Sequence, residues 1–150
     1  MDIVRLSVPG SLPYRDVVLR AVASACRRVR PPTQEQEISR EPAAAEFESK
    51  VLSAVTEAFN NVAIHAYRGR PAGPVDVELE PTDYGVTIRL MDMGHGYDPT
   101  AKPPPDLHSL PESNMGLFIM RSCMDYVSYE RGNPPAAPNV LTLSKRYPGA

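Results

Sequence analysis

A chain of 150 residues can bury a continuous core as one domain without disulfides or a structural metal. Its 42% hydrophobic and 23% charged residues are typical of a soluble globular protein, which argues against disorder and against membrane association. The formal net charge of -2, with acidic and basic residues interspersed, lacks the basic surface that direct nucleic-acid binding needs. The N-terminus has no secretory signal, so we expect one cytoplasmic domain over residues 1–150.

The N-terminal part of the chain predicts a strand and then a helix. Apolar and polar residues alternate from Asp2 to Pro9, and Gly10 follows, which is typical of a short strand ending in a turn. From Tyr14 to Val29 the apolar residues recur at helical spacing. The stretch from Pro31 to Pro42 is polar and proline-flanked, and we interpret it as a surface connection without chemistry.

The middle of the chain predicts the longest helix and a hairpin. A broad apolar face runs from Ala44 to Tyr67, and the following glycines and proline end the helix. The stretches Val75 to Glu80 and Val86 to Met91 are typical of strands, and the Asp and Gly between them suit a tight turn. These two strands should therefore form an antiparallel pair.

The C-terminal part contains a long loop, a helix and two strands. A glycine- and proline-rich segment follows Asp92, an apolar helical run begins at Gly116, and strands are predicted over Tyr126–Glu130 and Asn139–Arg146. A loop of roughly twenty residues is rare in a compact domain unless it serves a ligand. The element order predicts an α+β two-layer sandwich, in which three helices cover one face of a mixed, mostly antiparallel sheet of about five strands.

Glu57 and Asn61 lie four residues apart on the longest predicted helix, so their side chains project from one face. A carboxylate can take a proton from an attacking hydroxyl. An amide oxygen can ligate Mg²⁺ without adding charge that repels phosphates. The pair suits phosphoryl transfer, although Glu and Asn on a helix surface are also commonly just solvated.

A second candidate segment, DMGHG, begins at the predicted strand end. Gly94 and Gly96 let a ligand approach the main chain, and Asp92 can accept a hydrogen bond from an exocyclic amine such as that of adenine. A plain glycine turn capped by an aspartate has the same pattern, so both interpretations stay open for this segment alone.

The third candidate segment comprises Asn114, Met115, Gly116 and Leu117. Here we expect Gly116 to open a helix whose N-terminal amides face an anion such as phosphate. An ordinary helix start would look the same.

Taken in this order, the three segments resemble the GHKL (Bergerat-fold) ATPases. TEAFNNVAIHAY is similar to their N box, DMGHGYDP to their first glycine box, and ESNMGLFIMRSCMDYVSY to their second. The last segment, in which a helix runs directly into a strand, is most similar to the anti-sigma-factor serine kinases of the RsbW type. The resemblance covers nearly the whole chain, and these kinases are single domains of similar size.

The resemblance implies a role for each candidate residue. Glu57 would be the general base, Asn61 would ligate Mg²⁺, and Asp92 would bind the adenine amine of ATP. Residues 97–114 would form the ATP lid. The other positions of the two glycine boxes would contact the nucleotide: Gly94 and Gly96 along its border, and Met115, Gly116 and Leu117 at its phosphates.

Two positions depart from the family pattern. Asn114 stands where a first glycine is common, so we expect altered phosphate contacts. Pro138–Asn139 stands where the family often has a Gly-Thr pair near the adenine, so we expect one nucleotide contact to be missing.

The resemblance also implies a function and partners. The chain would use ATP to phosphorylate a serine or threonine on an anti-sigma-factor antagonist of the STAS type, and the same domain would sequester a sigma factor; a homodimer is allowed. Two alternatives remain: a catalytically weak, nucleotide-dependent protein-binding module, and a histidine-kinase catalytic domain acting in trans. We assign no catalytic role to His65, His95 or His108.

Overall fold

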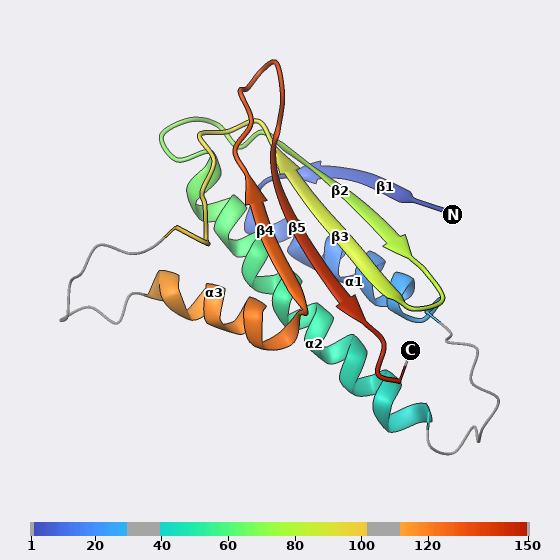
Figure 1. Ribbon diagram of the computed structural model, residues 1–150. Helices are drawn as coiled ribbons and strands as arrows, with labels where there is room; N and C mark the ends of the chain where they lie inside the picture. The colour runs from blue at the N-terminus through green and yellow to red at the C-terminus, as the bar shows by residue number, and fades with distance from the viewer. Residues whose placement is uncertain (1, 30–39, 102–111, 150) are drawn as a thin grey trace.

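The computed structural model describes residues 2–29, 40–101 and 112–149, and the side chains of 40, 41 and 112–114 are outside this description. It shows one sheet with helices packed on one face (Figure 1). The strands are β1 (Val4–Pro9), β2 (Pro74–Pro81), β3 (Gly85–Asp92), β4 (Tyr126–Glu130) and β5 (Asn139–Arg146). The helices are α1 (Arg15–Cys26), α2 (Arg40–Asn61) and α3 (Glu112–Cys123), with short turns η1 (Leu12–Tyr14) and η3 (Val62–Ala66).

The sheet has the strand order β1-β2-β3-β5-β4, and every pairing is antiparallel. Side chains alternate between its two faces, because successive residues of a strand point in opposite directions. Val77, Leu90 and Leu141 face each other across three strands and are all buried. The expected two-layer α+β sandwich is therefore confirmed, with β3 as its middle strand.

The core lies between the buried face of the sheet and the three helices. Helix α2 supplies its centre, since Phe47, Val51, Val55 and Phe59 recur at helical spacing and are almost fully buried. Each side chain of this kind stabilises the fold by about 1.5–3 kcal/mol relative to leaving it exposed. Because α2 is fixed by this packing, the polar positions on its other side are held rigidly as well.

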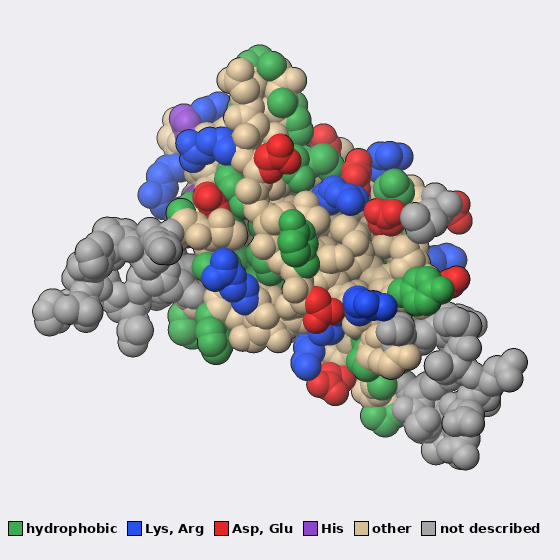
Figure 2. Space-filling view, viewed as in Figure 1, with side chains coloured by type: hydrophobic (Ala, Val, Ile, Leu, Met, Phe, Trp, Pro, Cys, Tyr) green, Lys and Arg blue, Asp and Glu red, His purple; other side chains and the backbone are tan. Residues whose placement is uncertain are grey.

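The opposite face of the sheet is polar and exposed. Figure 2 shows acidic and basic side chains interspersed over it. Arg5 lies 3.2 Å from Glu78, and Arg89 lies 3.3 Å from Glu80, so several of these charges are paired across strands. No helix in the described ranges has the length and apolar character needed to cross a membrane.

The helix bounds differ from the prediction at several places, including the end of the longest helix, where α2 ends at Asn61 and the π-helical turn η3 follows to Ala66. Helix α1 ends at Cys26, before the predicted Val29. Helix α2 begins at Arg40, and Pro42 fits there because the first turn of a helix needs no backbone N–H donors. Helix α3 begins at Glu112, so the expectation that Gly116 opens this helix is wrong.

Candidate functional site

Glu57 and Asn61 meet α3 at Gly116. Helices α2 and α3 pack against each other, and a Cβ added at Gly116 would lie 3.2 Å from Glu57 Oε2 and 3.9 Å from both terminal atoms of the Asn61 amide. The glycine therefore leaves room for these two polar side chains under the helix. Three candidate residues from two distant segments are thus brought together.

The Asn61 amide has an unused polar atom. Its Nδ2 is buried and has no hydrogen-bond partner in the described part of the chain, which is uncommon because buried polar atoms are nearly always paired. A half-turn of the amide exchanges Nδ2 with Oδ1, so either a donor or an acceptor can face a ligand from this position. The position suits a polar ligand such as a hydrated cation.

A single π-helical turn carries the chain from Asn61 toward the strand end. The turn η3 follows α2 directly, and its last carbonyl, that of Ala66, accepts a hydrogen bond from the backbone N–H of His95 at 2.7 Å. A side chain at Gly94 would clash with the same carbonyl, so only glycine allows this approach. Short π-helical turns occur frequently at functional sites, and this one joins the Glu57 helix to the glycine segment.

Tyr67 ties the end of the helix to the sheet. Its hydroxyl donates to the carbonyl of Pro74 at 2.6 Å and accepts from the backbone N–H of Met93 at 3.0 Å. Burial raises the pKa of Tyr67 above its ordinary value, so the hydroxyl keeps the proton that it donates. The side chain of Tyr67, the residue after η3, is therefore bonded both to the start of β2 and to the residue after Asp92.

Asp92 lies at the end of β3 and is only 4% exposed. Its Oδ1 accepts hydrogen bonds from the backbone N–H of Gly94 at 3.0 Å and from Asn139 Nδ2 at 3.1 Å. Within the ranges that the structure describes, no hydrogen bond ends on Oδ2. A buried carboxylate with one bonded and one unbonded oxygen can accept a hydrogen bond from a ligand amine.

Gly96 brings the glycine segment against β4 and β5. It has a positive φ of 79°, and a Cβ there would clash with the Tyr129 hydroxyl and lie 3.1 Å from the Asn139 amide. That hydroxyl is buried and, among the described residues, makes no hydrogen bond of ordinary distance and angle, although Arg131 is near enough to affect its pKa. Burial and then the charge of Asp92 raise the pKa of Tyr129.

The start of the predicted lid lies on η3. The ring of Tyr97 stacks on His65 with centroids 4.1 Å apart and planes 16° apart. Most of the predicted lid, with His108, falls outside the described residues, as do the side chains of Glu112, Ser113 and Asn114. His65 and His95 therefore lie beside the site, where His65 supports the first lid residue and His95 contributes its backbone N–H.

The expected phosphate contacts in α3 need revision. Gly116 is the fifth residue of the helix, and only the first four N–H groups of a helix are free of intrahelical bonds. The amides that can face an anion are therefore those of residues 112–115. Met115 is 60% exposed and Leu117 is half-buried.

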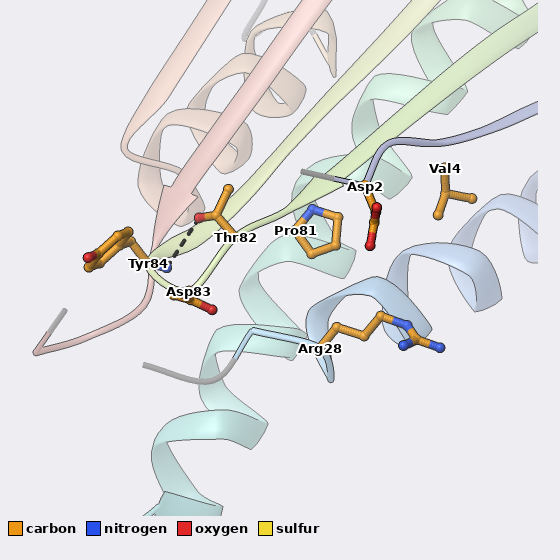
Figure 3. Close-up of a pocket in the computed structure, with 7 residues that line it drawn as sticks. All are labelled: Asp2, Val4, Arg28, Pro81, Thr82, Asp83 and Tyr84. Carbon is orange, nitrogen blue, oxygen red and sulfur yellow. Dashed lines mark hydrogen bonds between the residues drawn. The ribbon is translucent and has the colours of Figure 1, made fainter. Parts of the chain in front are cut away.

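A hollow at the far end of the sheet holds none of the predicted site residues. It has a volume of about 780 Å³ and is lined by Asp2, Val4, Arg28 and the β2–β3 turn (Figure 3). The turn is fixed by Thr82, whose hydroxyl accepts a hydrogen bond from the backbone N–H of Tyr84 at 3.2 Å. In the register of β2 and β3 this turn lies opposite to the end that carries Asp92, so the hollow is separate from the candidate site.

The candidate residues have the kinds of group that could bind a purine nucleotide and a metal ion. Asp92 can accept from a base amine, glycines line the approach, and Asn61 has an unpartnered buried atom. In the described part of the chain no group of three or more His, Cys, Asp or Glu could hold a metal. A metal ion here would therefore take its other ligands from phosphates and water, as Mg²⁺ commonly does.

Two residues of this site were not found by sequence reasoning. Tyr67 looked like the last residue of an apolar helix face, and nothing in the sequence pairs it with Met93. Asn139 was predicted only to leave one nucleotide contact missing, and its hydrogen bond to Asp92 was not foreseen. The only signal was its place at the start of a strand, which does not reveal the strand opposite.

Comparison with known proteins gives a consistent result. Residues 14–145 match the family model described as histidine kinase-like ATPase domain. The chain is 37% identical over 89 residues to an anti-sigma F factor of Clostridium beijerinckii, covering 55% of this chain and 62% of that protein. It is 38% identical over 93 residues to the serine/threonine-protein kinase BtrW of Bordetella bronchiseptica, covering 59% of this chain and 63% of that protein.

A solved structure agrees with the fold. The histidine kinase domain from the Erythrobacter litoralis EL346 blue-light activated histidine kinase superposes with a TM-score of 0.52 at 18% identity, covering 93% of this chain and 62% of that one. The sequence matches above span less than two thirds of the length of either relative.

Proposed function

Because the chain belongs to the histidine kinase-like ATPase domains, we propose that it binds ATP with Mg²⁺ and phosphorylates a serine or threonine of a small regulatory protein. One observation carries this proposal: the hydrogen bond from His95 N–H to the Ala66 carbonyl, which joins the helix of Glu57 and Asn61 to the segment that follows Asp92. The side chains of both segments can then contact one ligand.

Each candidate residue has a role in this reaction. Asp92 accepts a hydrogen bond from the adenine amine and so orients ATP in the site. Asn61 ligates Mg²⁺, which would neutralise phosphate charge. Met115 and Leu117 lie beside Gly116 on α3, and the first turn of this helix contacts the phosphates.

Glu57 acts on the protein substrate. The substrate hydroxyl oxygen attacks the γ-phosphorus, its proton passes to the Glu57 carboxylate, and the bond to the β-phosphate oxygen breaks to release ADP. Glu57 is half-buried beside Gly116, so in the described part of the chain its side chain keeps some exposure to solvent. General base catalysis of this kind contributes about 10²–10⁴-fold to the rate.

The relatives suggest the class of partner. One relative is named an anti-sigma F factor and another a serine/threonine-protein kinase. We therefore propose an anti-sigma-factor antagonist of the STAS type as the substrate, and a sigma factor as a second partner that the same domain sequesters. A homodimer would place two partner-binding domains in one assembly.

Incubation with γ-labelled ATP, Mg²⁺ and candidate STAS-type antagonists tests this proposal, with Glu57→Ala as the matched variant. The kinase predicts label on a serine or threonine that disappears in Glu57→Ala while ATP binding persists. ATP binding without transfer to any antagonist would instead indicate a protein-binding module. Acid-labile label on histidine would indicate a histidine-kinase domain acting in trans.

A further inference from the structure

Asn139 is the first residue of β5 and is 1% exposed. Its Nδ2 donates to Asp92 Oδ1 and to the Gly94 carbonyl, both at 3.1 Å, and its Oδ1 accepts from the Gly132 backbone N–H at 3.0 Å. Both N–H groups and one oxygen lone pair are therefore used within the protein. The amide has no donor left for a ligand.

These bonds determine how Asp92 is presented. Asp92 and Asn139 are directly opposite in the register of β3 and β5, so the strand pairing itself sets their distance. The Oδ1 of Asp92 receives both the Gly94 N–H and the Asn139 amide. Because a carboxylate is planar, fixing Oδ1 also fixes the direction of Oδ2. The geometry of these bonds leaves Oδ2 as the oxygen that can accept a hydrogen bond from a ligand.

We propose that Asn139 is a positioning residue that makes the base site selective for a 6-amino purine, acting through Asp92 and not on the base. This inference rests on the nucleotide binding proposed above. A fixed Oδ2 accepts from the amine of adenine, whereas the 6-oxo group of hypoxanthine places a second acceptor against it. Without Asn139, the carboxylate can turn away from this direction, so discrimination falls.

The hydrogen bond from Gly132 could give Asn139 a purely structural role, and the experiment must distinguish this role from the positioning of Asp92. Gly132 lies in the β4–β5 hairpin, and Asn139 could serve only to close that hairpin. Asn133 lies in the same hairpin with an exposed side chain, and its backbone pairs with Ala137. Asn133→Ala is therefore a matched control that removes the same side chain without touching Asp92.

The test is the ratio of dissociation constants for ITP and ATP, measured by calorimetry with Mg²⁺ on the full chain. We expect Asn139→Ala to lower this ratio about tenfold, which is about 1.4 kcal/mol, and Asn133→Ala to leave it unchanged. An unchanged ratio in a folded Asn139→Ala protein would overturn the inference and leave a hairpin role alone. If the wild-type protein binds neither nucleotide, the proposed function fails and this inference with it.

A second, nearly isosteric variant tests the same idea through pH. Asn139→Asp places a carboxyl about where the amide lies, so two carboxyls would share a proton and one pKa would rise. At low pH the introduced carboxyl donates to Asp92 as the amide does, and it loses this ability as the pH rises. We expect ATP affinity of this variant to fall from pH 5 to pH 8 relative to wild type. Tyr67 and Tyr129, which lie near enough to Asp92 for its charge to affect them, have raised pKa values and stay protonated in this range.

If the ATP affinity of Asn139→Asp changes with pH only as the wild-type affinity does, the proposed action through Asp92 is contradicted. This variant also keeps the inference testable if Asn139→Ala does not fold, because its shape is almost that of the natural residue.

Discussion

The two ends of the candidate site are built differently. At the base end, made of Asp92, Gly94 and Asn139, hydrogen bonds within the protein hold Asp92 Oδ1 and the Asn139 amide, and no described residue bonds to Asp92 Oδ2. At the transfer end, made of Glu57, Asn61 and Gly116, the Asn61 amide keeps a buried atom without a partner in the described part of the chain. The fold therefore orients the ligand-binding oxygen of the base end by its own hydrogen bonds, whereas the transfer end offers a buried polar atom that a ligand would satisfy. Binding and transfer should then respond to different substitutions.

The largest difference between the effect on phosphoryl transfer and the effect on ATP binding is expected for Glu57→Gln. Removing the proton acceptor should lower phosphoryl transfer about 10²–10⁴-fold, while ATP affinity stays within about twofold of wild type because the base end is intact. Transfer is measured with labelled ATP and binding by calorimetry. Glu46→Gln on the exposed part of the same helix, where Glu46 pairs with Lys50 at 2.9 Å, is the matched control and should alter neither. Equal losses of ATP binding and phosphoryl transfer in Glu57→Gln would contradict the distinction between a base end that binds and a transfer end that catalyses.

Substitution of Gly94 at the base end and of Gly116 at the transfer end should change the stability of the protein in opposite directions. Gly94→Ala drives a methyl group into the Ala66 carbonyl and should lower the free energy of unfolding by about 3 kcal/mol. Gly116→Ala lies inside α3, where its methyl group would lie 3.2 Å from the flexible Glu57 carboxylate and 3.9 Å from the Asn61 amide, so helix propensity should raise stability by up to about 1 kcal/mol. Urea unfolding of both variants checks the contrast, and similar destabilisation of both would break it.

Asp92→Asn should weaken ATP binding without slowing transfer at saturating ATP. A hydrogen bond to a charged group contributes about 1.5–3 kcal/mol, so its loss corresponds to roughly one to two decades in the dissociation constant. The introduced amide can present an N–H toward the adenine amine, which adds to the loss. A thermal melt shows whether the variant is folded, and wild-type affinity in a folded variant would exclude Asp92 from the base end.

The smallest effect is expected at His65, beside the start of the lid. Burial and then the charge of Arg68 lower the pKa of His65 from 6.5, so the folded chain takes up this proton at lower pH than the unfolded chain. Its contribution to stability is present above pH 6.5 and declines as the pH falls below it. Because His65 is only partly buried, we expect a change of about 2 °C in Tm between pH 7 and pH 5. His65→Phe keeps an aromatic ring against Tyr97 and should remove this change; an identical pH profile would contradict the assignment.

Much of the fold could be predicted because its elements carry strong local patterns. Alternation in Val86–Met91 and helical spacing in α2 each depend on residues that are close in sequence. The start of α3 was missed because Glu112, Ser113 and Asn114 are polar and carry no apolar period. Helix three was therefore expected to begin at the first apolar run, four residues too late.

The candidate site was predictable only residue by residue. Asp92 stands out at a strand end before glycines, and Glu57 and Asn61 share a helix face, so each could be named from its own neighbours. The bond between Asp92 and Asn139 joins residues 47 apart and depends on the register of β3 and β5. Long-range register is not encoded in any short pattern, so the sequence did not reveal that Asn139 bonds to Asp92.

Calorimetric titration of the wild-type, Asp92→Asn and Asn61→Ala proteins with ATP and Mg²⁺ tests most directly whether both ends serve one nucleotide. We predict a single binding event of one ATP per chain that each substitution weakens, with only the Asn61→Ala protein losing the contribution of Mg²⁺. Absence of heat in the wild-type protein, or an affinity that neither substitution changes, would contradict a shared nucleotide site.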